Sequence, residues 1–164
     1  MSMPTLIREP AHRVSERAVA YWRLSALIGS VVLWVLLGVG YVLLVDPAWW
    51  VAALIVVVVA VDVAYMVAMP RVRFLVHRWE VTPTTVHTRS GWLTREERIA
   101  PLSRVQTVDS AQSALMRAFG LMSITVTTAS AAGPISIDCL DEATARAVVG
   151  ELTEITGRSA GDAT

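Results

Sequence analysis

Residues 24–69 read LSALIGSVVLWVLLGVGYVLLVDPAWWVAALIVVVVAVDVAYMVAM, and only Asp46 and Asp62 carry charge in this segment. The first apolar run, 24–45, would extend roughly 33 Å as a helix, which is enough to cross a hydrocarbon core of about 30 Å. The second run, 47–69, has a similar length, and Asp46 with the proline after it is the only turn signal between them. The sequence therefore predicts two membrane-spanning helices joined by a tight turn.

Arginines flank this segment on its two outer sides, and the turn between the runs has none. Those before the first run are Arg8, Arg13, Arg17 and Arg23, and those after the second are Arg71, Arg73 and Arg78. Basic residues favour the cytoplasmic side of a membrane, so both termini are predicted to be cytoplasmic. The first run is too long for a signal peptide and no cleavage site follows it. We therefore expect a multi-pass plasma-membrane protein with two spans.

After the second run the pattern changes to short segments separated by turn signals, which is typical of antiparallel strands. The segments expected to be strands are 74–81, 85–89, 92–99, 105–110, 123–128 and 135–139. Residues 114–119 predict a short helix that ends at Gly120. The apolar spacing after Asp141 predicts an amphipathic helix, capped by this residue and ended by Gly157.

The chain as a whole is thus predicted to be an α+β protein, with a transmembrane helical hairpin followed by a bent antiparallel sheet that one C-terminal helix closes. The expected parts are a cytoplasmic segment over 1–23 (irregular to residue 14, helical from a cap at Ser15), the hairpin over 24–69 ended by Pro70, the sheet domain over 70–157 and a disordered tail over 158–164.

Four motifs carry a resemblance to a known family: RWEVTPTTV at 78–86, SGWLTREER at 90–98, PLSRVQTVD at 101–109 and LMRAFGL at 115–121. Together with the two preceding helices, they resemble the bacterial pleckstrin-homology-like (PH-like) membrane proteins of the YdbS type. The resemblance covers nearly the whole chain. It implies a membrane-anchored PH-like fold without a described catalytic activity, whose relatives are proposed to act in cell-envelope physiology, and it transfers no binding site.

The best-known pleckstrin domains bind phosphoinositides through several cations around their first hairpin. The corresponding segment here, 80–87, begins with Glu80 and has no lysine or arginine. This composition argues against phosphoinositide binding by that mode.

Asp62 is the one acid within the second span. It lies eight residues before Pro70, roughly 12 Å inside the cytoplasmic end, where a lipid-facing acid costs about 2.5–3.5 kcal/mol. We therefore expect it to face protein, with Ser30 and Gly29 at a similar depth and Arg23 within reach by snorkelling. A proton- or ion-coupled site is the alternative, but no second acid or histidine lies at this depth, which favours a structural contact.

Two sets of side chains are candidate contacts of the domain. Arg71, Arg73 and Arg78 follow the second span closely, and we expect them to contact an anionic leaflet without stereospecificity. The second set, which is a candidate for a partner or an anionic lipid, consists of Trp92, Arg95, Arg98 and Arg104. Glu96 and Glu97 cancel much of the positive field of this second set, which favours a solvated, ion-paired face.

Other classes of function find little support in the sequence. The chain has no nucleophile elbow, phosphate-binding loop or dinucleotide motif, and its histidines fall at no metal-ligand spacing, so neither an enzyme nor a cofactor or metal site is expected. The domain has as many acids as arginines, which argues against nucleic-acid binding. Cys139 is the single cysteine and is interpreted as a small buried hydrophobe.

These features favour an interaction or assembly module that binds a protein partner or another copy of itself. The spans already concentrate the domain at the bilayer, so an intrinsic affinity for lipid would add little to localisation. The alternative is a module that senses anionic lipid through Arg71, Arg73, Arg78 and Arg95. A transporter subunit with Asp62 on the path would require further spans from other copies.

Overall fold

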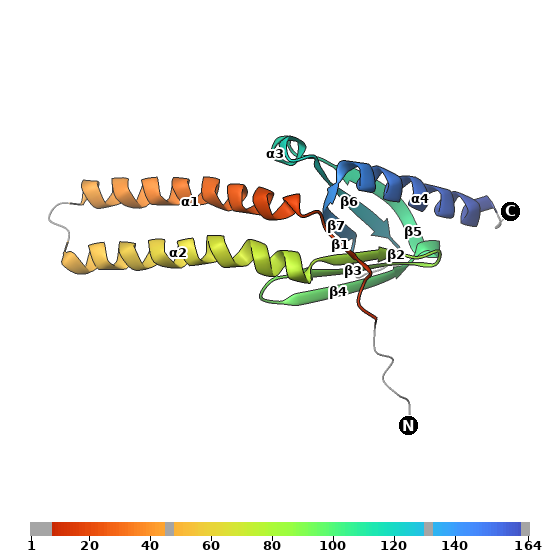
Figure 1. Ribbon diagram of the computed structural model, residues 1–164, viewed down its shortest axis with the longest axis horizontal. Coiled ribbons are helices and arrows are strands. Elements are labelled where there is room, and N and C mark those ends of the chain that lie inside the picture. Colours follow the sequence, from red (N-terminus) through yellow and green to blue (C-terminus); the bar gives the residue numbers. More distant parts are fainter. Residues whose placement is uncertain (1–7, 45–47, 130–132, 162–164) are drawn as a thin grey trace, which may run out of the picture.

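The computed structural model describes residues 8–44, 48–129 and 133–161, with the backbone alone for 158–161. Its elements in chain order are β1 His12–Arg13, α1 Arg17–Leu43, α2 Trp49–Val76, β2 Arg78–Val81, β3 Thr85–Gly91, β4 Arg95–Pro101, the 3-10 turn η1 Leu102–Arg104, β5 Val105–Ala111, α3 Ala114–Ala118, β6 Leu121–Thr128, β7 Ile135–Asp141 and α4 Glu142–Gly161. Figure 1 shows α1 and α2 side by side, projecting from one end of a sheet domain along which α4 lies. The predicted α+β architecture is confirmed.

The helical pair is apolar and almost entirely exposed. In their most apolar stretches α1 and α2 have mean hydropathies of 2.3 and 2.7, and 6% and 0% of those stretches are buried. Both helices are long and apolar enough to cross a membrane. Soluble proteins rarely expose apolar surfaces of this size to water, so this pattern fits helices whose side chains face lipid. The predicted turn at residues 46–47 lies outside the described residues.

The second helix is longer than predicted. Pro70 was expected to end it, but α2 continues through Pro70 to Val76, so residues 74–76 are helical instead of starting a strand. A proline within a helix removes one backbone hydrogen bond and crowds the preceding turn. Here Met69, Pro70 and Val76 are buried, and this packing offsets the lost bond.

The domain consists of two antiparallel sheets, one with the strand order β1-β2-β3-β4 and the other with the order β5-β6-β7. The turn η1 leads the chain from the first sheet to the second. The apolar side of α4 packs against the second sheet, and its Leu152 is fully buried with Leu121, Ile124 and Val126 of β6. The alternating pattern of β6 and the helical spacing of α4 thus build one core, as predicted.

The segment before the helices belongs to this domain. Residues 1–14 were expected to be irregular, but β1 pairs with β2, with His12 opposite Trp79 and Arg13 opposite Arg78. Val14 and Ala18 are buried in the domain core. A two-residue strand has no periodicity of its own, so its pairing depends on the sheet edge that β2 offers.

The C-terminal helix also exceeds its predicted end. Gly157 does not end α4, which continues to Gly161, so the expected disordered tail is wrong for residues 158–161. Residues 162–164 lie outside the described residues. Glycine lowers helix stability by only about 1 kcal/mol relative to alanine, which a packed helix tolerates.

Candidate functional site

The joint between the helical pair and the domain is formed by Trp22, Arg73 and His77. Trp22 of α1 is buried, and its ring lies 5.5 Å from the ring of His77, which follows α2. The guanidinium carbon of Arg73, in the last turn of α2, lies 4.6 Å from the centre of the Trp22 ring. A cation over an indole face stabilises by about 0.5–2 kcal/mol, depending on its desolvation. The joint therefore ties the domain ends of the two helices together, and Trp22 attaches them to the domain because it is part of the domain core.

His77 is bound in the joint through both ring nitrogens. Its Nδ1 lies 2.9 Å from the carbonyl oxygen of Arg73, and its Nε2 accepts a hydrogen bond from Nε of Arg73 at 3.3 Å. These contacts fit a neutral ring with its proton on Nδ1. Burial of the ring, and after it the charge of Arg73, lower the pKa of His77 below its usual value. The joint thus contains an ionisable group that is satisfied in its neutral form.

A bulge in β7 ties the start of α1 to the same region. Two residues of β7 face one residue of β6 near Ser123, and Cys139 in this bulge has a φ of 56°. The Cys139 amide donates to the Ser123 hydroxyl at 3.3 Å, and its carbonyl accepts from the Ser15 amide at 3.0 Å. The Ser15 hydroxyl donates to Oδ1 of Asp141 at 2.8 Å. These bonds hold the chain that leads into α1 against the end of the second sheet.

Cys139 itself is a structural residue, as predicted. Only 2% of its surface is exposed, and burial, followed by the nearby charge of Asp138, raises the pKa of its thiol to about 11. The thiol therefore stays protonated and unreactive at neutral pH.

The arginines predicted to contact the membrane surface lie in different environments. Arg73 is held in the joint, over the ring of Trp22. Arg78 is ion-paired with Glu9 at 3.8 Å and donates to the carbonyl oxygen of Pro10 at 3.5 Å. Both of these guanidinium groups are thus bound to other parts of the chain.

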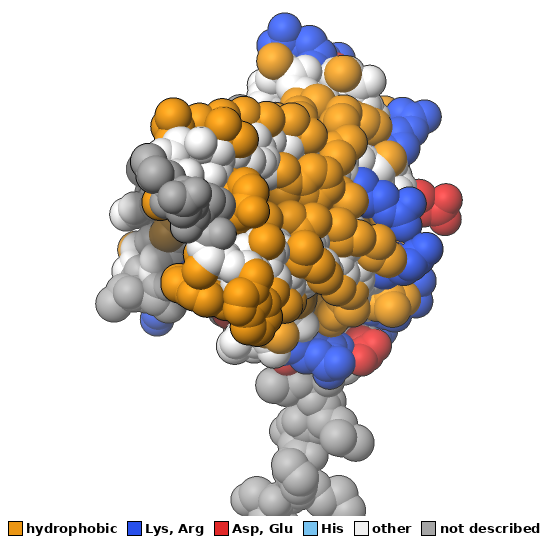
Figure 2. Space-filling view, turned by 90° about the vertical axis from the view of Figure 1, so that its left-hand side faces the viewer, with side chains coloured by type: hydrophobic (Ala, Val, Ile, Leu, Met, Phe, Trp, Pro, Cys, Tyr) orange, Lys and Arg blue, Asp and Glu red, His pale blue; other side chains and the backbone are white. Residues whose placement is uncertain are grey.

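Arg71 is exposed and lies with Arg23 on an apolar groove between α1 and α2 of about 460 Å³. The remaining lining residues are apolar side chains of both helices. Figure 2, which looks toward the free end of the helices, shows hydrophobic side chains over the helical surface and arginines along the rim behind it. This arrangement places hydrocarbon-compatible surface next to cations, as at a membrane boundary.

Asp62 is half-buried in α2, and its Oδ2 atom is buried without a hydrogen-bond partner among the described residues. Ser30 of α1 is buried. Among the described residues, however, Asp62 forms no hydrogen bond with Ser30 and no ion pair with Arg23. Nε1 of Trp34 is also buried and unpaired there. The expected contacts of Asp62 with Ser30 and Arg23 are therefore not formed in this structure.

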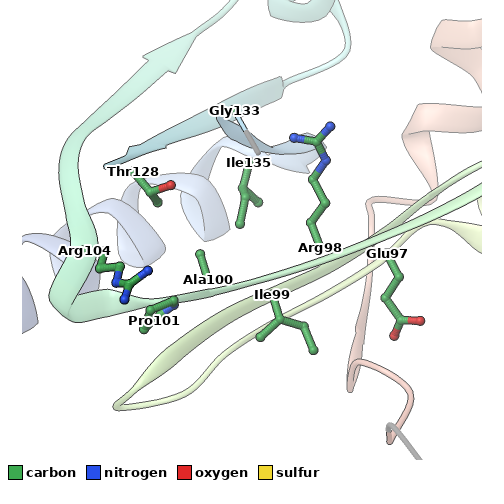
Figure 3. A pocket seen from close by; sticks show the side chains of 9 residues that line it. All are labelled: Glu97, Arg98, Ile99, Ala100, Pro101, Arg104, Thr128, Gly133 and Ile135. Carbon is green, nitrogen blue, oxygen red and sulfur yellow. The ribbon is translucent and has the colours of Figure 1, made fainter. Parts of the chain in front are cut away.

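A groove of about 310 Å³ follows β4, the edge strand of the first sheet, and separates it from the ends of β6 and β7. Its lining residues are Glu97, Arg98, Ile99, Ala100, Pro101, Arg104, Thr128, Gly133 and Ile135. Figure 3 shows Arg98 and Ala100 pointing from β4 toward β7, with Glu97 and Ile99 on the other side of the strand. We refer to this site as the β4 groove.

The two cations of the β4 groove differ in their partners. Arg98 donates to Glu96 at 2.8 Å and to the carbonyl oxygen of Pro134 at 3.0 Å, so it bridges β4 to the start of β7. Arg104 is exposed and forms no ion pair with any described residue. Thr128 was missed by the sequence reasoning, although a threonine on the apolar side of its strand was an available signal.

The other two candidate residues lie at the opposite end of β4. Trp92 begins the turn between β3 and β4, and its ring centre lies 5.2 Å from that of Tyr65 in α2 with an interplanar angle of 76°. Arg95 begins β4 and is not part of the β4 groove. The four predicted contacts thus divide into a pair near the helices and a pair in the β4 groove.

Two exposed apolar helices, fixed by a packed joint to a two-sheet domain with a C-terminal helix, define a membrane-associated protein with a PH-like domain. The chain belongs to the bacterial PH domain family, whose model matches residues 23–156. It is 27% identical over 138 residues to the UPF0699 transmembrane protein YdbS of Bacillus subtilis (strain 168), an alignment that covers 82% of this chain and 87% of that protein. No solved structure matches the chain. The family is not a known enzyme family, and the relative supports a location in the membrane.

Proposed function

We propose that this chain is a two-span protein of the bacterial plasma membrane with both termini in the cytoplasm, and that its PH-like domain binds a protein partner or a second copy through the β4 groove. The observation that carries this proposal is the position of the groove. It lies on an open sheet edge, at the end of the domain remote from the helices.

The short joint supports a role other than recruitment to lipid. β2 begins two residues after α2 ends, and Trp22 of α1 is buried at the same place. A domain held so closely to two spans is already at the bilayer, so affinity for lipid headgroups adds little to its local concentration. Its free surface is available to recognise neighbours.

Distance separates the β4 groove from the headgroups. In Figure 1, β4 runs away from the helices, and the six residue steps from Arg95 to Pro101 correspond to roughly 20 Å of strand. Arg104 lies beyond Pro101, whereas the field of an anionic leaflet is screened over about 8 Å at physiological salt. The turn between β2 and β3, where the best-known pleckstrin domains hold phosphoinositides, is also at the remote end of the domain.

The chemistry of the groove suits an extended segment of polypeptide. The outer edge of β4 is available for added strand pairing, because β4 ends its sheet. Ala100 and Ile135 give the groove a small apolar floor, and Arg104 provides a free cation at one end. We therefore propose a partner segment with small apolar side chains and an acidic residue placed to meet Arg104.

Photo-crosslinking in bacterial membranes tests this proposal. A photoreactive benzoylphenylalanine in place of Ile99, which lines the groove and is 52% exposed, should give a protein adduct of defined mass in the full chain, and the same probe in place of the exposed Arg146 on α4 should not. Arg104→Ala should weaken or remove the adduct, since Arg104 supplies the cation for the partner's acidic residue, while Arg95→Ala, outside the groove, should leave it. Equal protein adducts from both positions, or adducts with lipid alone, would contradict a protein site in the groove.

The proposed topology has its own test. A reporter that is active only in the cytoplasm, fused after Thr164, should be active, and the same reporter inserted after Val45, where the sequence predicts the turn between the spans, should be inactive. An inactive reporter after Thr164 would place the domain on the other side of the membrane and overturn this part of the proposal.

The alternative, a module that senses anionic lipid, is supported by the groove that Arg23 and Arg71 share. If this groove selects an anionic lipid, the full chain purified in detergent should retain that lipid, and retention should fall in Arg23→Gln and Arg71→Gln but not in Arg104→Gln, at the end of the domain remote from the helices. Equal retention of anionic and zwitterionic lipids by all these variants would contradict a lipid-selective groove and leave only nonspecific attraction between the arginines and the membrane.

A further inference from the structure

The turn between β3 and β4 presents apolar side chains where turns ordinarily carry polar ones. Trp92 and Leu93 occupy its apex, and Leu93 is 79% exposed. Tight turns are dominated by glycine, proline, asparagine, aspartate and serine, so an exposed Trp-Leu pair at an apex calls for a specific environment.

The backbone of this turn requires a glycine at Gly91. Gly91 has a φ of 119°, and a Cβ atom at this position would lie 1.8 Å from the carbonyl oxygen of Thr94. Gly91 pairs with Arg95 across the strands, so the turn between them contains only three residues. The turn is therefore tight, and its apex lies at the end of the β3–β4 ribbon.

A contact with α2 sets the depth of the apex. Figure 1 shows the β3–β4 ribbon reaching back along α2, and the Trp92 ring packs edge-on against Tyr65 at 5.2 Å. Tyr65 lies within the predicted span, six residues before Arg71. Along the helix it is therefore roughly 9 Å from Arg71, toward the middle of the membrane. Since Trp92 contacts Tyr65, the apex reaches the same level of the bilayer.

From this geometry we infer that the β3–β4 turn inserts into the cytoplasmic leaflet, with Leu93 among the upper acyl chains and Trp92 at the headgroup boundary. This inference rests on the proposed two-span topology. Tryptophan prefers the membrane–water boundary, and Arg95, one residue after the turn, is placed to meet the phosphates. The turn is then a second attachment of the domain to the bilayer, beside the helical pair.

Depth-dependent quenching in nanodiscs tests the inference. Single cysteines are introduced in the full chain by Leu93→Cys at the apex, Leu36→Cys near the middle of the predicted first span and Ser103→Cys in η1, and each is labelled with a polarity-sensitive fluorophore. All three positions are exposed, so labelling should not disturb packing, and the native Cys139 is buried and protonated at pH 7. The nanodiscs contain lipids with a quencher at a shallow or a deep acyl position.

The label at Leu93 is expected to emit to the blue of the label at Ser103 and to be quenched strongly by shallow lipid quenchers. The label at Leu36 should be quenched by deep ones, and the label at Ser103 by neither. If Leu36 is quenched and Leu93 is not, the insertion is wrong, while the placement of α1 in the bilayer stands. A blue-shifted but unquenched Leu93 label would indicate a protein contact and would overturn the insertion. If Leu36 is not quenched, both the topology and the insertion fail.

Discussion

Truncation of Trp22 is expected to loosen the joint between helices and domain while the domain core stays folded. Only 4% of Trp22 is exposed. A buried tryptophan removes about 150–250 Å² from water, which at about 25 cal/mol/Å² corresponds to about 4–6 kcal/mol. Residual burial in the open state lowers this figure by roughly 10–40%, in line with about 3–5 kcal/mol for large-to-small changes in cores. An open cavity of about 450 Å³ already borders the ring, so relaxation is possible and the lower end, about 3 kcal/mol, applies to Trp22→Ala.

Hydrogen exchange of the full chain in nanodiscs measures this change. Opening of the joint must break the hydrogen bond from the Ser15 amide to the Cys139 carbonyl. About 3 kcal/mol corresponds to roughly a hundredfold change in the opening equilibrium, so amides of β1, Ser15 and β7 should exchange roughly a hundredfold faster in Trp22→Ala. Amides of β6, around the fully buried Ile124, should change much less.

Two variants make this test specific. Trp50→Ala changes a tryptophan that is 58% exposed at the other end of α2, and it should leave exchange in the domain unaltered. Trp22→Phe keeps most of the apolar area and should give an intermediate effect. A change below about tenfold at the joint in Trp22→Ala, or an equal acceleration throughout the domain, would refute the reasoning, since the joint would then not depend on this ring.

Three further predictions follow from single residues. Gly91→Ala should destabilise the domain by about 1–3 kcal/mol, because the φ of 119° at this position is strained for alanine. Gly150→Ala, in open space on α4, is the control and should leave stability unchanged or raise it by about 0.5–1 kcal/mol. Urea unfolding in detergent compares the free energies of unfolding of the two variants. The pKa of His77 is lowered in the folded chain, so the neutral ring stabilises the fold fully above pH 6.5, the ordinary pKa of histidine. This stabilisation is lost as the pH falls toward the lowered pKa, so the free energy of unfolding should decline less below pH 6.5 in His77→Phe than in the parent chain. Asp62→Leu should assemble as well as the parent chain on size-exclusion chromatography, since a carboxylate oxygen without a partner is replaced by hydrocarbon, and aggregation of this variant would show that the acid makes a needed contact.

Features that depend on local patterns could be predicted from the sequence. The two apolar runs, the alternation along β6 and β7 and the helical spacing of α4 each occur within one segment, and the structure has an element at each of these places. The short helix α3 was also predicted. The hydroxyl of Ser113, just before this helix, caps it by accepting a hydrogen bond from the Met116 amide. In each of these segments propensity and burial favour the same element.

Features that depend on distant contacts could not be predicted in this way. Residues 74–76 fit a strand or a helix equally by pattern, and the burial of Val76 decides for the helix. β1 forms because β2 offers an edge, and the joint brings Trp22 within reach of Arg73, which follows it by 51 positions. The arginines after the second span illustrate the same limit. By sequence, Arg71, Arg73 and Arg78 are equally good candidates for membrane contact, and only the packing shows that Arg71 is the exposed one.

The proposed attachments together determine which partners the β4 groove can meet. A domain held by the joint alone could still pivot, but insertion of the β3–β4 turn would add a second fixed point and so set its orientation. The groove would then face molecules whose chains extend roughly 20 Å from the bilayer, which takes about six residues in extended conformation. A partner anchored in the same membrane satisfies this condition at a high effective concentration, so even a weak groove suffices. A free peptide copy of the partner segment is therefore expected to bind weakly in solution, whereas crosslinking from a probe at Ile99 in the intact membrane is expected to be efficient.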